Sequence, residues 1–129
     1  MNRKAEAIEI ISRLSEEYLG AKIALKFSNP LELLVATVLS AQCTDAIVNR
    51  VTAGLFDKYR TAEDYANADL GQFEQEVRST GFYRVKARNI INAARLMLTD
   101  FDAQVPKTMA ELVILPGVAR KTANIVLYN

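Results

Sequence analysis

An almost entirely apolar segment near the start of the chain constrains the fold most. From Leu31 to Leu39 only Glu32 and Thr37 are polar. Asn29 and Pro30 stand directly before it, and they are typical of a helix N-cap and of the first helical position. A helix that is apolar on nearly all sides has to be surrounded by other elements. The sequence therefore predicts a central, buried helix that begins near Pro30.

Helical spacing of apolar residues continues on both sides of this segment. It predicts a first helix that ends at Gly20, a helix after Thr44, and two short helices capped by Thr61 and Asp69. The longest helix is expected from about Tyr83 to Asp100, with a stripe of Ala87, Ile90, Ile91, Ala94, Met97 and Leu98.

No alternating strand pattern occurs, so the predicted fold class is all-α, a helical bundle. We expect residues 1–20 to form an N-terminal helix and residues 21–129 to form a helical domain that ends in a helix–hairpin–helix at about 108–129. The chain of 129 residues has the length of one domain.

Composition narrows the possible function only slightly. The net charge is +1, so any surface that binds nucleic acid must be local. The chain has one cysteine, Cys43, and no histidine, which makes a zinc or iron–sulfur site within these residues unexpected. No signal peptide precedes Lys4 and no apolar run reaches membrane-spanning length. We therefore expect a cytoplasmic protein without a membrane partner.

The last part of the chain predicts a helical hairpin. Thr108 and Glu111 have the spacing of a capping box, Pro116 ends the helix begun there, and Gly117 permits a tight turn. A second helix is expected to start near Val118, with Lys121 in its first turn. Unpaired N–H groups at such a helix start suit a phosphate. Taken alone, Lys121 is better explained as a solvated lysine on an ordinary hairpin.

The sequence of this hairpin reads Leu-Pro-Gly-Val-Ala-Arg-Lys-Thr-Ala-Asn from Leu115 to Asn124. It closely resembles that of the endonuclease III family. These are helical DNA glycosylases with lyase activity in base-excision repair. The resemblance implies that Lys121 is the nucleophile. It also implies that hairpin amides bind a DNA phosphate, here those of Gly117, Val118, Ala119 and Arg120. The family hairpin usually has a second glycine where this chain has Ala119, so we expect a negative φ at Ala119.

Two further segments resemble DNA contacts of the family. Ser40–Asp45 is similar to its Ser-Ala-Gln-x-Thr-Asp segment, which implies that Gln42 enters the duplex where the damaged base leaves and that Asp45 lies at the DNA. The amide of Gln42 offers donors and an acceptor to an orphaned base. Without the family, Gln42 and Asp45 are an ordinary loop and helix start.

The second segment, Thr80–Tyr83, resembles the family's loop with an apolar wedge. Phe82 stands where leucine is common, and an apolar side chain in a base step helps to unstack it. The alternative is that Phe82 is a core residue. Basic residues follow and could meet the DNA backbone or form a solvated edge: Arg84, Lys86, Arg88 and Arg95.

The complete family has a further C-terminal portion, which this sequence does not contain. The resemblance implies that it carries a catalytic aspartate in a Val-Asp-Thr-His-like segment and, in most members, four cysteines that bind a 4Fe–4S cluster. Ile125 and Tyr128 share the side of Lys121 on a helical wheel and would need a cover. We therefore expect a truncated chain whose cover lies beyond Asn129. The alternative is that Ile125 and Tyr128 meet a neighbouring helix of the same domain.

The resemblance predicts a bifunctional DNA glycosylase and AP lyase that works as a monomer on double-stranded DNA. It would remove damaged bases, such as oxidised pyrimidines, and cleave 3′ to abasic sites through a lysine imine. The chain alone would be inactive. Two alternatives remain open: a non-catalytic helix–hairpin–helix module that binds DNA, and a helical interaction domain without nucleic acid.

Overall fold

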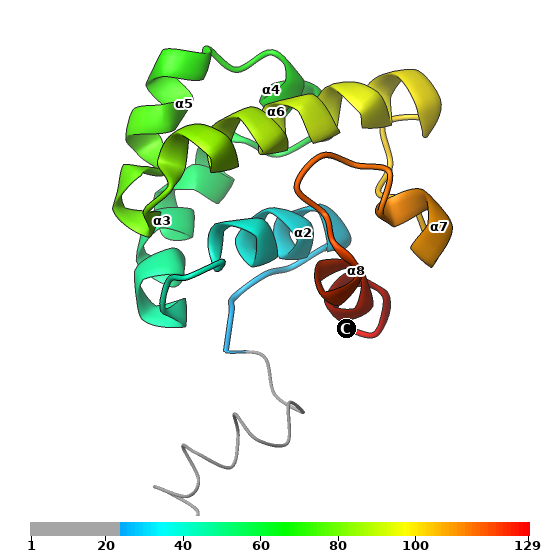
Figure 1. The fold of residues 1–129 in the computed structure, drawn as a ribbon. Coiled ribbons are helices and arrows are strands. Elements are labelled where there is room, and N and C mark those ends of the chain that lie inside the picture. The colour runs from blue at the N-terminus through cyan, green and yellow to red at the C-terminus, as the bar shows by residue number, and fades with distance from the viewer. Residues whose placement is uncertain (1–23) are drawn as a thin grey trace, which may run out of the picture.

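The computed structural model describes residues 24–129, and within that range every regular element is a helix (Figure 1). The predicted helix over 1–20 lies outside the described residues. The elements are α2 (Pro30–Leu39), α3 (Asp45–Lys58), α4 (Ala62–Ala66), α5 (Leu70–Glu76), the 3₁₀ helix η1 (Arg78–Thr80), α6 (Tyr83–Asp100), α7 (Met109–Leu112) and α8 (Arg120–Leu127). In this part of the chain, no helix has the length and apolarity needed to cross a membrane.

Helix α2 lies at the centre of the fold, in contact with α3, α6 and α8 (Figure 1). Every residue from Leu33 to Leu39 is buried. The Oδ1 atom of Asn29 accepts a hydrogen bond of 2.9 Å from the Glu32 amide, which fixes the start of the helix. The buried hydroxyl of Thr37 donates to the Leu33 carbonyl at 2.7 Å, so it leaves no unpaired polar group. The prediction of a central buried helix is confirmed.

The remaining helix starts follow from side-chain caps, as the sequence predicts. Thr44, Thr61, Asp69 and Thr108 each accept a hydrogen bond from the amide three residues later. The long helix α6 has the predicted bounds, and five of the six residues of its predicted stripe are buried. Leu98 is exposed, whereas Lys86 is buried.

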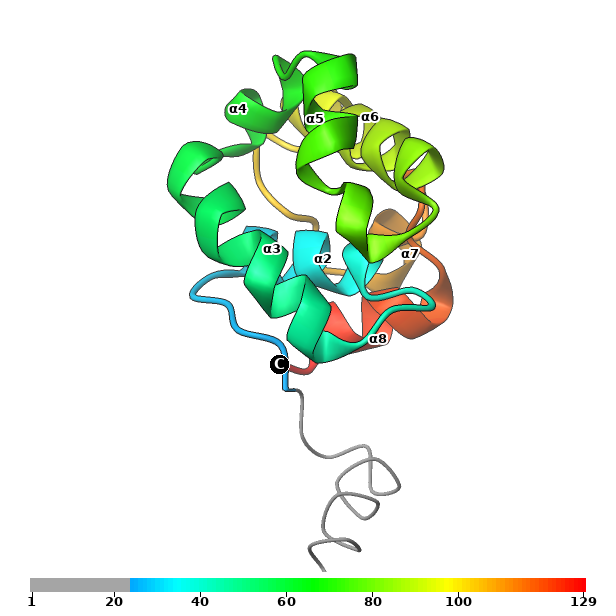
Figure 2. The same cartoon turned by 90° about the vertical axis from the view of Figure 1, so that its left-hand side faces the viewer.

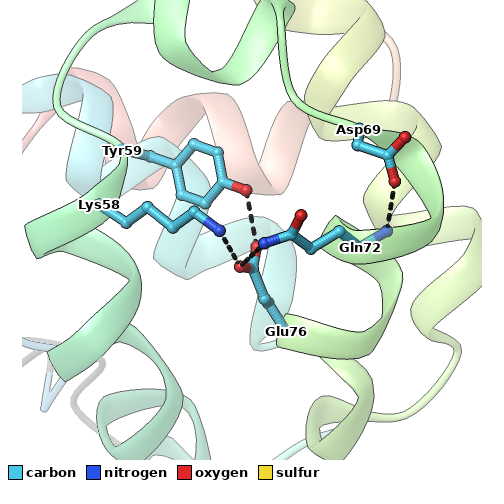
Figure 3. Close-up of polar contacts among 5 residues, drawn as sticks. All are labelled: Lys58, Tyr59, Asp69, Gln72 and Glu76. Atoms are coloured by element: carbon cyan, nitrogen blue, oxygen red, sulfur yellow. Dashed lines mark hydrogen bonds and ion pairs between the residues drawn. The ribbon is translucent and has the colours of Figure 1, made fainter.

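A cluster of three aromatic rings joins α3, α4 and α5. The rings of Tyr59 and Tyr65 stack with their centroids 5.0 Å apart, and Phe73 meets both edge-on. At the rim of this cluster, Glu76 accepts hydrogen bonds from Tyr59 Oη at 2.6 Å, from Gln72 Nε2 at 3.2 Å and from the Lys58 ammonium (Figure 3). These bonds hold the end of α3 against α5.

The partners of Glu76 also shift its pKa. Burial of the carboxyl acts to raise its pKa, but the hydrogen bonds from Lys58, Tyr59 and Gln72 outweigh burial and hold the pKa below its usual range. For Tyr59, burial and the neighbouring Glu76 carboxylate both raise the pKa of the phenol. The phenol therefore stays neutral and keeps its proton for the bond to Glu76.

A helical hairpin closes the described chain. The Leu115 carbonyl accepts a hydrogen bond of 3.1 Å from the Val118 amide, with Pro116 and Gly117 between them. The φ of Gly117 is +81°, as the third position of a type II turn requires. Ala119 precedes α8 with φ −89°, which agrees with the expected negative value. The second helix begins at Arg120, slightly later than predicted.

One side of α8 packs against the rest of the fold. Ala123 and Val126 are buried, and α8 contacts α2 through this face. Ala119 is exposed because it lies before the first helical turn.

Glu76→Gln should destabilise the protein by about 1–2 kcal/mol at neutral pH, because hydrogen bonds to a charged group are stronger than neutral ones. The pKa of Glu76 is lower when folded than when unfolded. The stability it contributes is therefore fully present above about pH 4.3 and is lost as pH falls through the folded pKa. Thermal unfolding should show the two proteins converging at acid pH. Glu74→Gln, on the same helix but outside the Glu76 hydrogen bonds, is the control. A difference between wild type and Glu76→Gln that is equal at pH 7 and pH 3 would contradict the role of the charge.

Gly117→Ala should destabilise the protein by about 1–2 kcal/mol, because positive φ disfavours residues with a Cβ atom. The added Cβ would also lie 2.8 Å from the Asn89 Cβ atom of α6. Gly54→Ala is the matched control, since Gly54 lies inside α3 and its added Cβ meets nothing within 4 Å. That change should stabilise the protein by up to about 1 kcal/mol. Equal unfolding temperatures for Gly117→Ala and wild type would show that the turn accepts a Cβ atom at position 117 without strain.

Candidate nucleic-acid interface

Three connecting segments gather around the first turns of α6. They are the loop 40–44 between α2 and α3, the bend 81–82 before α6, and the hairpin 113–119. The Lys86 ammonium of α6 donates hydrogen bonds to the Ala41 and Thr80 carbonyls. The Gly117 backbone lies against Asn89, less than one turn further along α6. Figure 2 shows all three segments on the same side of the molecule. The segments that resemble family DNA contacts therefore share one face.

In the loop 40–44, Gln42 is exposed and its backbone is left-handed, with φ 53°. The Cys43 amide donates to the Ser40 carbonyl at 3.1 Å, which closes a turn with Gln42 at its tip. Asp45 is half-buried and is the first residue of α3. The loop thus presents the Gln42 side chain to solvent, while Asp45 stands at the base of the loop.

In the bend before α6, Phe82 has 66% of its surface exposed and φ 46°. The alternative that Phe82 is a core residue is therefore wrong. A left-handed backbone costs a residue with a Cβ about 1–2 kcal/mol, and strain of this kind clusters at functional sites. The next residue, Tyr83, has the Arg84 guanidinium 5.0 Å from the centroid of its ring. The bend thus combines an exposed aromatic side chain with a nearby cation.

The hairpin exposes Gly117, Ala119, Arg120 and Lys121. Ala119 gives α8 no side-chain cap, so the first amides of the helix have no intrahelical or capping partner in the described chain. Val118 differs from its neighbours: its side chain is buried and its amide already donates within the turn. The other three residues predicted to bind phosphate are exposed.

Lys121 lies in the first turn of α8 and is exposed. The two apolar residues expected on its side behave differently. Ile125 is half-buried and packs against the core of this same domain, as the alternative interpretation held. Tyr128 follows the end of α8 and has 78% of its surface exposed.

The arginines of α6 are exposed, but they differ in their partners. Arg84 and Arg88 are exposed, but Arg95 donates through Nε to the Ala66 carbonyl at 3.1 Å, at the far end of the fold. Lys86 is buried, so the expectation that it meets the DNA backbone is wrong. Its helical spacing from Ile90 and Ala93 places it on the apolar face of the helix, and this spacing is the feature of the sequence that indicates its burial.

The described residues do not supply ligands for a metal cluster. Across residues 24–129, no three His, Cys, Asp or Glu side chains gather closely enough to hold a metal ion. Cys43, the single cysteine of the sequence, stands alone in the loop before α3. The donor set therefore does not fit a 4Fe–4S cluster.

Comparison with known proteins places this geometry in a family. Residues 35–127 match the model of the HhH-GPD superfamily base excision DNA repair proteins. The chain is 50% identical over 126 residues to endonuclease III of Synechocystis sp., covering 98% of this chain and 58% of the relative. It is 47% identical to endonuclease III of Bacillus subtilis, covering 91% of this chain and 53% of the relative. The chain thus spans somewhat more than half the length of these curated relatives.

A solved structure agrees with the sequence relatives. A trapped endonuclease III–DNA covalent intermediate, in an estranged-adenine complex, superposes with a TM-score of 0.82 at 46% identity. That similarity covers 96% of this chain and 58% of the solved chain. The all-helical fold, the hairpin and the family match agree: this chain belongs to the HhH-GPD superfamily of base excision DNA repair proteins.

Proposed function

We propose that this protein is a DNA glycosylase with AP lyase activity and that Lys121 is its nucleophile. The observation that carries the proposal is the position of Lys121. It is exposed in the first turn of α8, directly after the Pro-Gly turn, on a helix that belongs to a family-matched hairpin. A similar protein that forms a trapped covalent intermediate with DNA supports a covalent route.

In the proposed reaction the neutral amine of Lys121 attacks the sugar C1′ atom of an extruded nucleotide. A bond forms between Nζ and C1′, and the bond from C1′ to the base breaks, so that the base leaves with the electron pair and takes up a proton. The bond between C1′ and O4′ then breaks, the lone pair of Nζ forms the C=N bond of the imine, and O4′ takes up a proton. Loss of a proton from C2′ then expels the 3′ oxygen, which cleaves the strand 3′ to the abasic site, and water releases the amine.

The other predicted residues have supporting roles in this proposal. Exposed amides at Gly117, Ala119 and Arg120 bind a DNA phosphate, which positions the duplex without reading its sequence. Gln42 enters the duplex and pairs with the base left alone, and Phe82 wedges into the neighbouring step. The estranged adenine in the complex of the similar protein supports this role for Gln42.

The substrate we propose is double-stranded DNA with an oxidised pyrimidine or an abasic site, bound by one copy of the protein. Because the substrate is cellular DNA, we propose a cytoplasmic location, at the nucleoid in a prokaryotic source. A 4Fe–4S cluster does not fit the single cysteine of these residues, and no step of the reaction is derived from one.

The alternative function is a non-catalytic helix–hairpin–helix module that binds DNA. The chain spans 58% of the endonuclease III of Synechocystis sp. and contains no Val-Asp-Thr-His segment. Both facts favour testing activity in a longer protein as well as in this chain. Covalent capture of DNA by Lys121 separates the two functions.

Gln42→Gly and Phe82→Gly should each weaken binding to a duplex with an abasic-site analogue by about tenfold, while binding to undamaged duplex changes little. Glycine also relieves the positive φ at both positions, so the unfolding temperature should stay equal or rise. Binding is measured by fluorescence anisotropy and stability by thermal unfolding. Leu70→Ala, an exposed apolar residue on α5, is the control. Unchanged lesion preference in both glycine variants would remove these residues from the interface.

Lys121→Gln should abolish covalent capture of abasic DNA by borohydride, which reduces an imine to a stable adduct. The test compares this chain with a fusion to the C-terminal portion of the Bacillus subtilis relative. We expect little adduct with the chain alone and a clear adduct with the fusion. In the fusion, Lys121→Gln should keep much of the duplex affinity, because backbone amides make the phosphate contact.

The matched control for this experiment is Lys107→Gln, which removes an exposed lysine outside the hairpin. It should leave capture at the wild-type yield. Full capture by the Lys121→Gln fusion would overturn the nucleophile assignment. A wild-type fusion that binds duplex tightly without forming the adduct would favour the non-catalytic module.

A further inference from the structure

Lys86 is the buried cation of the described chain, with 5% of its surface exposed. Its ammonium group has three N–H donors, and each one has a carbonyl partner. Nζ donates to the carbonyls of Leu39, Ala41 and Thr80, each at 2.8 Å. The ammonium is therefore fully paired, which is the condition under which a charge can be buried.

The three carbonyls belong to two different connections of the fold. Leu39 is the last residue of α2, and Ala41 directly precedes Gln42 in the loop 40–44. Thr80 ends η1 and stands two residues before Phe82. A single ammonium thus joins the two loops at the residues next to their exposed, left-handed tips.

The chemistry of the site favours a cation at this place. The carbonyl of Leu39, the last residue of α2, accepts no backbone hydrogen bond in the described chain and lies at the negative end of the helix dipole, and α2 has no basic residue in its last turn. Lys86, on α6, supplies the positive charge that the end of α2 lacks. Burial lowers the pKa of Lys86, while the nearby Cys43 acts in the opposite direction.

Lys86 also lies on the same helix as the contact that positions the hairpin. Asn89, less than one turn later on α6, is the residue against which Gly117 packs. The start of α6 therefore contacts all three segments of the candidate interface. The Lys86 amide also donates to the Phe82 carbonyl at 3.1 Å, so the bend is joined to α6 through its backbone as well.

We propose that Lys86 is a positioning residue that holds the loop of Gln42 and the bend of Phe82 at a fixed separation, so that both side chains enter a damaged duplex as one rigid unit. The inference rests on the proposed function, because it assigns a purpose to the two loops on DNA. Lys86 itself does not touch the DNA. Its effect is to reduce the ordering that the loops would otherwise undergo on binding.

The main test uses Lys86→Met in the 129-residue chain, which keeps the length of the side chain and removes its donors and charge. Its preference for an abasic-site analogue over undamaged duplex should fall at least tenfold, about 1.4 kcal/mol. Affinity for undamaged duplex should stay within about twofold. Hydrogen exchange should become faster at residues 40–44 and 80–82, with or without DNA.

Three control variants separate positioning from general damage to the fold. Lys86→Arg retains charge and donors, and its lesion preference should recover to within about threefold of wild type. Lys107→Met removes the same charge from an exposed site and should keep the wild-type preference. Met97→Ala creates a cavity at the far end of α6, and it should lower the unfolding temperature without changing lesion preference. A preference that falls equally in Met97→Ala would overturn the proposal.

Lys86→Gln keeps two N–H donors and covers the case in which Lys86→Met does not fold. Its lesion preference should fall about threefold, and a wild-type preference would overturn the positioning role. If the wild-type chain binds duplex but does not distinguish the lesion, this inference and the proposed roles of Gln42 and Phe82 fail, whereas the assignment of Lys121 is decided separately by the capture experiment. If wild type distinguishes it and Lys86→Met does so equally well, only this inference fails.

Discussion

The burial of α2 on all sides is the constraint on which the rest of the fold depends. Because every residue from Leu33 to Leu39 is buried, α3, α6 and α8 have to surround one short helix. Segments far apart in the sequence are thereby brought to the end of α2, where its carbonyls meet Lys86. The candidate interface lies at this end of the central helix. The packing of the core around α2 therefore also determines where the loops of the interface lie.

Much of this arrangement could be predicted from local sequence. The apolar run of α2, the caps at Thr44 and Thr61, and the Pro116-Gly117 turn each depend on residues close together in the chain, and each prediction is confirmed. The position of Lys121 in the first turn of α8 follows from the same local rules. Local signals therefore located the hairpin and its lysine.

Two features did not follow from the local patterns of the sequence: the exposure of Phe82 and the carbonyl partners of Lys86. The sequence left open whether Phe82 is a core residue, and the positive φ of the bend turns it outward. Lys86 resembled one of several surface cations, since its carbonyl partners at Leu39 and Ala41 lie more than forty residues earlier. Such partners become visible only when the helices are assembled.

The burial of Lys86 also determines how salt acts on the interface. In the proposed complex, a cation paired with three carbonyls would release no counterion when a duplex docks, whereas exposed cations that meet phosphate, such as Arg84, Arg88 and Arg120, would release one each. With a net charge of only +1, the chain has little long-range attraction for DNA to add to these contacts. Under the proposed function, salt should therefore weaken binding to every duplex, while the attraction between the buried Lys86 ammonium and its carbonyls is screened far less. Discrimination between damaged and undamaged DNA should then persist at ionic strengths where overall affinity has already declined.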